Sequence, residues 1–239
     1  MTGGTRGLGR GIALALAGAG CAVTVCGRNA PADLPAALSF RQADVRDADQ
    51  AAALVDAVAA EHGRLDVLVN NAGGSPATPA QDASPRFAEA ILKLNLLAPL
   101  FMAQAAYRHM AAAGRGSIVN IASVSGIRPS PGTAVYGAAK AGLLNLTQSL
   151  AQEWGPAGIR VNAIIAGLMA TENAAQTYGD EEAQAAVGAS MPLGRMGNGE
   201  DLAGAVLWLC SPLASWVSGA RINVDGGGER PYFLDLVKE

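Results

Sequence analysis

The stretch TGGTRGLG at residues 2–9 decides the fold, because it leads directly into an apolar stretch with helical character, Leu8–Ala19. Gly3, Gly7 and Gly9 permit a tight turn and let the backbone approach a ligand closely. The first amides of the following helix would offer free N–H groups and a partial positive charge, which suit a pyrophosphate. Such a turn alone does not establish a dinucleotide site, since glycine-rich helix starts are often only turns.

Short runs rich in Val and Ile alternate with longer Ala- and Leu-rich stretches along the rest of the chain, which is typical of βα units around a parallel sheet. The predicted strands are residues 22–26, 39–42, 67–70, 117–121, 160–164 and 221–224, and the predicted helices are residues 8–19, 48–62, 84–113, 134–154, 180–189 and 199–211. We therefore expect one α/β domain over residues 1–239, a Rossmann-like doubly wound parallel sheet that binds a dinucleotide and carries out catalysis. Residues 168–196 are poorly patterned and are expected to form a lid.

The start of the chain departs from this plan. A dinucleotide-binding glycine turn follows a first strand, whereas only Met1 and Thr2 precede Gly3 here. We expect the first strand to be missing or truncated in this sequence. Since that strand would lie near the middle of the sheet, its absence should leave two exposed strand edges.

Composition and charge exclude several classes of protein. The 239 residues carry a net charge of -3 with scattered Lys and Arg residues, so we expect neither a nucleic-acid nor a membrane partner. The longest apolar run, residues 91–106, is interrupted by polar residues and falls short of the roughly 18–20 apolar residues of a membrane helix. No signal peptide is visible, which predicts a cytoplasmic protein. The three cysteines form no CxxC pair and lie far from both histidines, so we expect no metal site.

Tyr136 and Lys140 lie four residues apart at the start of the predicted helix 134–154, so their side chains share one face. A lysine cation beside a phenol favours the phenolate and would lower the tyrosine pKa from about 10 toward the range useful for acid-base catalysis. Such pairs are common on helix surfaces, so this pair gains meaning only from its surroundings.

Other polar residues surround this pair in the predicted fold. Ser123 lies 13 residues before Tyr136 and follows the predicted strand 117–121, and the NNAG sequence at residues 70–73 ends another strand. Open α/β sheets bind ligands at the carboxyl ends of their strands, so these groups should converge on one edge. Asn95 sits in an otherwise apolar helical stretch, where its amide needs a partner.

With these pieces in place, the chain resembles the short-chain dehydrogenase/reductase family, and within it the 3-oxoacyl-thioester reductases. The matching motifs follow the family's order over nearly the whole chain: TGGTRGLG at 2–9, NNAG at 70–73, Asn95, Ser123, YGAAK at 136–140, and VNA at 161–163 leading to Ala166-Gly167. Together these motifs are highly specific, although none is specific alone. The family usually has Pro-Gly in place of Ala166-Gly167, a departure that predicts altered lid geometry rather than lost catalysis.

The resemblance implies a catalytic role for four residues. Tyr136 would protonate a carbonyl oxygen, or deprotonate an alcohol in the reverse direction, and Lys140 would lower the Tyr136 pKa and bind the nicotinamide ribose. Ser123 would hydrogen-bond the substrate oxygen, and Asn95 would position a water that links Lys140 to solvent. The alternative, that Asn95 and Ser123 only cap or kink the local backbone, stays open.

The choice of cofactor depends on the residues that follow the second strand. Residues 27–29 read Gly-Arg-Asn with no acidic residue, and Arg6 lies in the glycine loop, which favours NADP(H) over NAD(H). Arg28 as a solvated loop charge is the alternative. Asp44 is expected at the adenine but could instead cap the helix that follows it. The predicted cofactor-binding residues are Gly3, Thr5, Arg6, Gly7, Leu8, Gly9, Arg28, Asn29, Asp44, Val45, Asn71, Ala72, Gly73, Tyr136, Lys140, Gly167, Met169 and Thr171.

We therefore expect an NADP(H)-dependent oxidoreductase that transfers hydride between nicotinamide and a ketone or secondary alcohol, with a 3-oxoacyl thioester as substrate. A steroid or other apolar ketone is an alternative, because the predicted lid has no basic cluster. A catalytically idle dinucleotide-binding regulatory subunit is an alternative of another class, supported mainly by the short N-terminus. The resemblance also implies a homotetramer formed through the helices 84–113 and 134–154.

Overall fold

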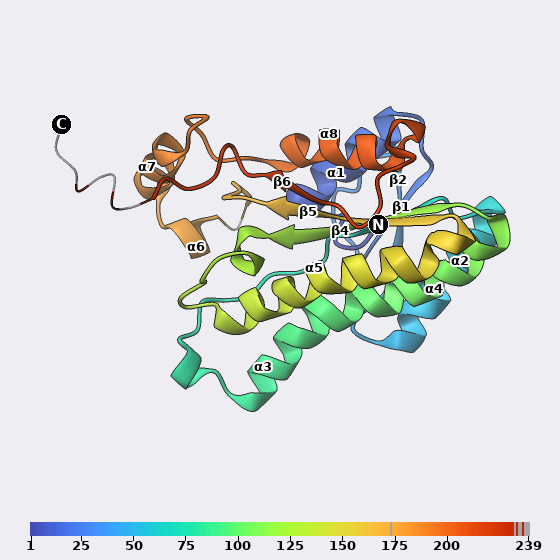
Figure 1. The fold of residues 1–239 in the computed structure, drawn as a ribbon, viewed down its shortest axis with the longest axis horizontal. Helices are drawn as coiled ribbons and strands as arrows, with labels where there is room; N and C mark the ends of the chain where they lie inside the picture. The colour runs from blue at the N-terminus through green and yellow to red at the C-terminus, as the bar shows by residue number, and fades with distance from the viewer. Residues whose placement is uncertain (173, 232, 234–235, 237–239) are drawn as a thin grey trace.

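Parallel strands joined by helices make up the part of the chain that the computed structural model describes, residues 1–172, 174–231, 233 and 236. The strands are β1 (Val23–Gly27), β2 (Leu38–Gln42), β3 (Val67–Asn70), β4 (Gly116–Ser123), β5 (Ile159–Ala166) and β6 (Arg221–Val224). The helices are α1 (Gly7–Gly18), α2 (Ala48–His62), α3 (Pro85–Leu92), α4 (Ala98–Ala113), α5 (Ala134–Trp154), α6 (Ala175–Tyr178), α7 (Glu181–Ser190) and α8 (Gly199–Cys210). Helices α1 and α8 cover one face of the strands, and α2, α4 and α5 cover the other (Figure 1). The doubly wound α/β fold predicted from the sequence is confirmed.

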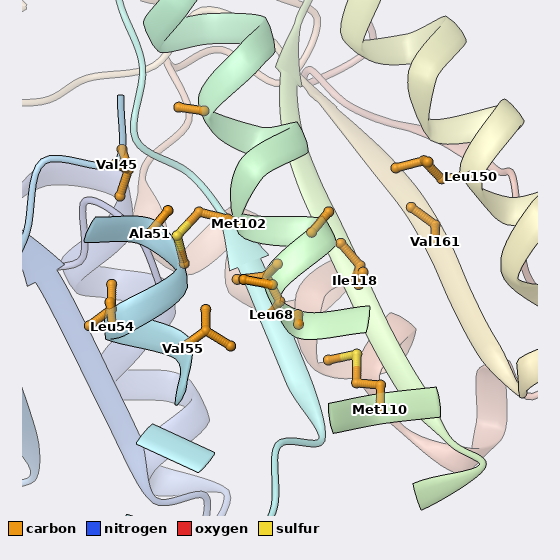
Figure 2. Close-up of a cluster of buried hydrophobic side chains, with 14 of the residues drawn as sticks. Val45, Ala51, Leu54, Val55, Leu68, Met102, Met110, Ile118, Leu150 and Val161 are labelled. Carbon is orange, nitrogen blue, oxygen red and sulfur yellow. The ribbon is translucent and has the colours of Figure 1, made fainter. Parts of the chain in front are cut away.

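Successive strand residues pack on opposite faces of the sheet. Leu68 of β3 and Ile118 of β4 pack with Met102 and Met110 of α4 (Figure 2), whereas the neighbouring Val69 belongs to the cluster formed with α1 and α8. Because helices cover both faces, the strands read as continuous apolar runs rather than as alternating ones. Their polar ends therefore stand out at the edge of the sheet.

The sheet is divided near its middle. Strands β1 and β2 form one sheet, and β3, β4, β5 and β6 form the other in that order. Residues 1–3 lie between them: Cys26 N donates to Met1 O at 3.1 Å, and Thr2 N donates to Val69 O at 3.0 Å. Among the described residues, this short bridge stands between β1 and β3, at the place where the sequence predicted a missing or truncated first strand.

A cavity of about 670 Å³ separates the two sheets beside Met1. Its walls include Val23 and Thr24 of β1 and Val67 and Leu68 of β3. The Thr24 hydroxyl is buried and has no hydrogen-bond partner among the described residues. The two strand edges expected from the sequence thus face each other across this cavity.

The predicted helix 84–113 forms as three consecutive pieces, α3, a π-helix (Lys93–Leu97) and α4. By length and composition alone the segment Pro85–Ala112 could cross a membrane, which corrects the expectation that no stretch is apolar enough. In the fold this segment packs against α2 and α5, and it supplies much of one hydrophobic cluster. Packing inside the protein therefore accounts for its apolar side chains.

Candidate active site

The glycine loop and the NNAG turn are held together by Thr2, which is buried. Its hydroxyl oxygen accepts hydrogen bonds from Asn71 N at 2.9 Å and from Ala72 N at 3.0 Å. The Asn71 side chain donates in turn to Thr2 O and to Gly3 O. The two loops, 68 or more residues apart in sequence, therefore form one rigid wall. Sequence reasoning missed Thr2, because its partners are set by the fold.

Two glycines of the loop are required by its geometry. Gly7 has φ of 52°, in the left-handed region, and a Cβ at Gly9 would lie 2.1 Å from Gly3 O. Helix α1 begins at Gly7 with no side-chain cap from Arg6, so its first N–H groups face a ligand site. This is the arrangement that binds phosphate at a helix N-terminus.

A carboxylate already bonds to one of these amides. Glu172, from the segment after β5, accepts a hydrogen bond from Gly7 N at 3.0 Å. Hydrogen bonds from its own N–H and from Gly7, together with Arg6 and Arg10, hold the pKa of Glu172 below its ordinary value. The helix start thus attracts an anion, as expected for a pyrophosphate site. Glu172 was not predicted, because only the folded lid brings it here.

A cavity of about 740 Å³ runs along this wall and is large enough for a cofactor. The predicted cofactor residues that line it are Gly3, Thr5, Arg6, Gly7, Leu8, Gly9, Arg28, Asn29, Asp44, Val45, Asn71, Ala72, Gly73 and Thr171. Two further arginines, Arg10 and Arg46, also line it and were not predicted. Arg10 pairs with Asp33 at 2.8 Å. Among the described residues, Arg6 and Arg28 have no carboxylate within ion-pair distance.

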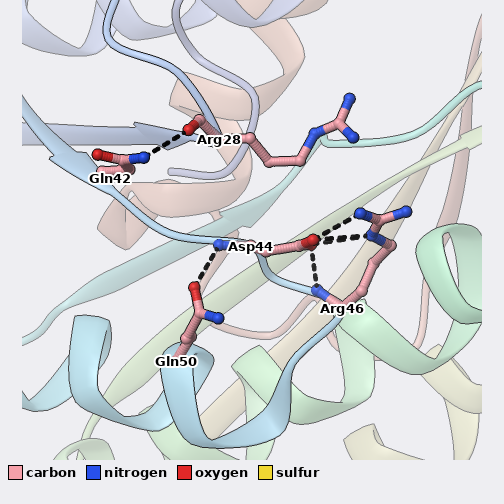
Figure 3. A network of polar contacts seen from close by, with 5 residues as sticks. All are labelled: Arg28, Gln42, Asp44, Arg46 and Gln50. Carbon is pink, nitrogen blue, oxygen red and sulfur yellow. Dashed lines mark hydrogen bonds and ion pairs between the residues drawn. The ribbon is translucent and has the colours of Figure 1, made fainter.

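Asp44 lies in the cavity wall and is held by Arg46 (Figure 3). The guanidinium makes contacts of 2.9 and 3.1 Å from Nε and 2.5 Å from Nη2 to the two carboxylate oxygens. Helix α2 is capped by Asp47, whose side chain accepts from Asp49 N and Gln50 N, so the alternative of Asp44 as the cap is wrong. The Arg28 guanidinium in the same view carries no ion pair.

The hydroxyls of Ser123 and Tyr136 meet at the carboxyl end of β4. Ser123 is the last residue of β4, and Tyr136 lies in the first turn of α5. Burial raises the Tyr136 pKa, a hydrogen bond with Ser123 partly offsets this, and nearby Tyr178 adds to the rise. This direction corrects the expectation that Lys140 lowers the Tyr136 pKa in this structure.

The surroundings of Lys140 show why this residue does not lower the Tyr136 pKa. Its ammonium is buried and donates to Ile121 O at 2.7 Å, and it lies 5.7 Å from the centre of the Tyr136 ring. Burial lowers the pKa of Lys140 itself to about 8. Desolvation of the two groups therefore outweighs the attraction between cation and phenolate.

Asn95 is fully buried at the π-helix, whose wider turn directs its side chain inward. Its amide donates to Ile91 O and Gly74 O at 3.0 Å each, and its oxygen accepts from Gly74 N at 2.9 Å. A Cβ at Gly73 would lie 2.7 Å from Asn95 Oδ1 and 3.2 Å from Lys140 Nζ. Asn95 and Lys140 thus meet at Gly73, which also lines the cofactor cavity. The water-positioning role of Asn95 stays a prediction.

Four predicted cofactor residues lie outside the cavity lining: Tyr136, Lys140, Gly167 and Met169. Met169 is drawn away by a β-bridge to Gly197 and lines a separate cavity with Met191. Gly167 packs against Asp225, where an added Cβ would lie 2.6 Å from the Asp225 Cα. The predicted lid contains α6 and α7, and its residue 173 lies outside the described residues.

Curated proteins similar to this chain are dehydrogenases and reductases. A 2-dehydro-3-deoxy-D-gluconate 5-dehydrogenase of Escherichia coli is 38% identical over 235 residues, covering 95% of this chain and 93% of that protein. A cis-4-hydroxycyclohexanecarboxylate dehydrogenase of Sinomonas cyclohexanicum is 38% identical over 237 residues, with coverage of 95% and 94%. A 3-oxoacyl-[acyl-carrier-protein] reductase of Chlamydia muridarum is 36% identical over 237 residues, with coverage of 95% for both chains.

Solved structures agree with this result. A candidate short-chain alcohol dehydrogenase of Sinorhizobium meliloti superposes with a TM-score of 0.89 at 39% identity, covering 95% of this chain and 93% of that one. A Tyr-to-Phe variant of ElxO with NADPH bound gives a TM-score of 0.87 at 27% identity, with coverage of 95% and 96%. A family model described as enoyl-(acyl carrier protein) reductase matches residues 3–229. Because that match runs through the glycine loop, the NNAG turn and the Tyr136 helix alike, the chain belongs to the short-chain dehydrogenase/reductase family and is an oxidoreductase of alcohols or ketones.

Proposed function

We propose that this oxidoreductase uses NADP(H) and Tyr136 to interconvert a ketone and a secondary alcohol. The observation that carries the proposal is that Tyr136, in the first turn of α5, lies beside Ser123 at the end of β4 and beside buried Lys140, whose ammonium is 5.7 Å from the centre of its ring. Gly73, in the wall of the large cavity, lies against Lys140, so a cofactor in that cavity would reach the two hydroxyls. The N-terminal amides of α1, one of which now bonds to Glu172, and the arginines of the cavity fit the phosphates of such a cofactor.

Each catalytic residue has a role that its surroundings support. The raised pKa keeps Tyr136 protonated near neutral pH, so it can donate a proton to a carbonyl oxygen held by Ser123. Lys140, with a pKa of about 8, is mostly protonated at pH 7 and stabilises the phenolate that this transfer leaves. When bound, NADP(H) would supply or accept the hydride.

The preference for NADP(H) rests on the charges at the ribose end of the cavity. Arg28 follows β1 where an acidic residue would favour NAD(H), and it forms no ion pair with a described carboxylate. The charge of Arg28 contributes to the lowered pKa of Asp44, but this carboxylate is already paired with Arg46. A free guanidinium suits a 2'-phosphate.

Replacing this arginine tests the cofactor choice. Arg28→Ala should raise the Kd of NADPH by about 10- to 100-fold, because a hydrogen bond to a charged group contributes about 1.5–3 kcal/mol, and it should leave NADH binding unchanged. Arg86→Ala on α3, an exposed arginine outside the cavity, is the matched control. Equal losses for both cofactors would contradict the proposal.

Two substrate classes are candidates. The 3-oxoacyl thioester predicted from the sequence is supported by the similarity to a 3-oxoacyl carrier-protein reductase. A hydroxy or oxo carboxylic acid is supported by two relatives whose names describe oxidation of gluconate-type and cyclohexane carboxylates. Both classes present a secondary alcohol or ketone to the same two hydroxyls.

Turnover with the tyrosine variant tests the chemistry directly. Consumption of NADPH is measured with acetoacetyl coenzyme A and with 4-oxocyclohexanecarboxylate, beside NADH. Tyr136→Phe should lower kcat by about 10²–10⁴-fold while NADPH still binds, because only the acid is lost. Tyr107→Phe on α4, which contacts Trp154 away from the site, is the control. An undiminished rate in Tyr136→Phe would refute the assigned role and favour a catalytic residue elsewhere.

The assembly and location are proposed on surface features. Leu213 and Trp216, after α8, are 85% and 99% exposed, and Phe101, Tyr107 and Trp154 line a hollow between α4 and α5. We expect these apolar surfaces to be covered in a homotetramer, which light scattering would detect as four times the mass of one chain. The three cysteines are free, as expected for a protein of the cytoplasm.

A further inference from the structure

The first residues of the chain lie in a lane between β1 and β3 and pair with both strands. On the β1 side, Met1 N donates to Thr24 O at 2.7 Å, and Cys26 N donates to Met1 O at 3.1 Å. On the β3 side, Thr2 N donates to Val69 O at 3.0 Å. Thr2 also forms a parallel bridge with Cys26. The lane therefore accepts an extended backbone that runs in the direction of β1.

This lane continues into the cavity of about 670 Å³ that separates the two sheets, which we call the strand slot. Backbone groups of alternate residues point to the same side of a strand. Thr24 O and Val69 O bond within the lane, so the Thr24 N–H and both backbone groups of Val67 point into the slot as well. On the far side of β3, Ser117 N donates to Asp66 O at 2.9 Å, in agreement with this alternation. Both edges of the slot thus present backbone groups that have no partner among the described residues.

Apolar side chains from helices on both faces of the sheets line the slot. Leu16 of α1 and Leu207 of α8 line it from one face. Leu54 and Val55 of α2 and Met102 of α4 line it from the other face (Figure 2). An occupant would be buried on both faces, as β3 and β4 are, and must therefore be apolar at successive positions rather than at alternate ones.

The unpaired backbone groups distinguish a peptide from other apolar ligands. An alkyl chain would fill the slot but would leave these N–H and C=O groups buried without a partner, which is costly. The hydroxyl of Thr24, a residue only 7% exposed that lines the slot, also has no partner among the described residues. A peptide strand carries donors and acceptors at the spacing that the two edges require.

We propose that the strand slot binds a separate linear peptide segment of about four to six apolar residues, which adds as a parallel strand between β1 and β3. The bound segment joins the two sheets. Cys26 lines both the slot and the cofactor cavity, and β1 and β3 each carry one wall of that cavity. Binding of the peptide and binding of the dinucleotide should therefore favour each other.

A synthetic peptide added to the 239-residue protein tests the site. Acetyl-Lys-Lys-Val-Ile-Val-Val with a fluorophore at its amino end keeps its charges outside the slot, and its binding is followed by anisotropy. We expect one peptide per chain with a Kd below about 100 µM. Saturating peptide should lower the Kd of NADPH at least about fivefold, and saturating NADPH should lower the Kd of the peptide by the same factor.

Changes in the peptide test how it lies. Serine in place of either of the two central apolar residues should weaken binding by similar factors of about tenfold, because both faces of the strand are buried. Proline at one of these positions should abolish binding, because it removes an N–H of the strand.

Changes in the protein test where the peptide lies. Val67→Pro removes an N–H of the slot and leaves the pairing with β4 intact, so it should weaken peptide binding at least about tenfold. Val58→Trp enlarges a side chain in the slot wall on α2 and should have the same effect. Trp216→Ser is the control, because this side chain is 99% exposed and does not line the slot.

Several outcomes would overturn the proposal. No saturable peptide binding by the wild-type protein would do so, as would an affinity that survives both Val67→Pro and Val58→Trp or falls in Trp216→Ser. Sensitivity to serine at only one of the two neighbouring positions would place the peptide on an outer surface instead. An unfolding curve for each variant shows that it is folded. Peptide binding is measured without turnover, so this result is separate from the proposed oxidoreductase function, whose failure would be no turnover of any ketone.

Discussion

Replacing Glu172 by Gln should tighten cofactor binding, which is the reverse of what removing a binding residue would do. Glu172 Oε1 accepts a hydrogen bond from Gly7 N at 3.0 Å, at the amides that a pyrophosphate needs. Binding of the dinucleotide must therefore displace this carboxylate. A hydrogen bond to a charged acceptor contributes about 1.5–3 kcal/mol and a neutral one about 0.5–1.5. Because Glu172 is exposed, we take the difference as about 1 kcal/mol, or about fivefold in Kd.

The assay is a titration with NADPH in the absence of substrate, followed by nucleotide fluorescence. Glu181→Gln is the matched control, since Glu181 is an acid of the first turn of α7 and does not line the cavity. The pKa of Glu172 lies below its ordinary value of 4.5, so its carboxylate stays ionised from pH 6 to pH 9. The gain should therefore be constant over that range and should shrink in high salt, which screens exposed charges. An unchanged or weaker affinity in Glu172→Gln would refute the reasoning.

Three further predictions concern stability and the glycine loop. The pKa of Lys140 is about 8 in the folded state and near 10.5 in the unfolded state, so the unfolded state binds more protons between these pH values. Denaturant titrations should therefore show the free energy of unfolding rising by about 3 kcal/mol from pH 8 to pH 10.5. This rise should be absent in Lys140→Met. Gly9→Ala should weaken NADPH binding at least about tenfold in the fluorescence titration, because the added Cβ would lie 2.1 Å from Gly3 O and must displace the loop. Asn95→Asp should lower the free energy of unfolding by about 2–4 kcal/mol, since a carboxylate cannot donate to Ile91 O and Gly74 O; an unaltered unfolding midpoint would contradict this.

The strands and the long helices were predictable because each is encoded locally. The apolar runs at β3 and β4 follow from burial on both faces, and α2 and α5 begin and end at the residues expected from their pattern. The placement of Ser123 and the NNAG turn at one edge followed from the rule that ligands bind at the carboxyl ends of parallel strands. Local pattern and topology together were enough to bring these residues near one another.

Features that depend on tertiary contacts could not be read from the sequence. In the π-helix, the buried amide of Asn95 bonds to Gly74, a residue 21 positions away that local pattern does not identify as its partner. The pKa of Tyr136 was expected to fall, since spacing on a helix reports which residues are neighbours but not how deeply they are buried. Glu172 and Arg46 were missed for a similar reason, because their importance comes from the charged partner that the fold places beside each of them.

Because the sheet is divided, cofactor binding and folding are coupled. Arg28 and Asp44 belong to the half of the cavity built on β1 and β2, whereas Asn71 follows β3 in the other half. Thr2 joins these halves through its bridge to Cys26 and through its hydroxyl, which accepts from the NNAG turn. A dinucleotide that contacts both walls adds a second connection across the division. Its binding energy therefore stabilises the arrangement of the two sheets as well as the complex, because a ligand that binds only the folded state shifts unfolding by mass action.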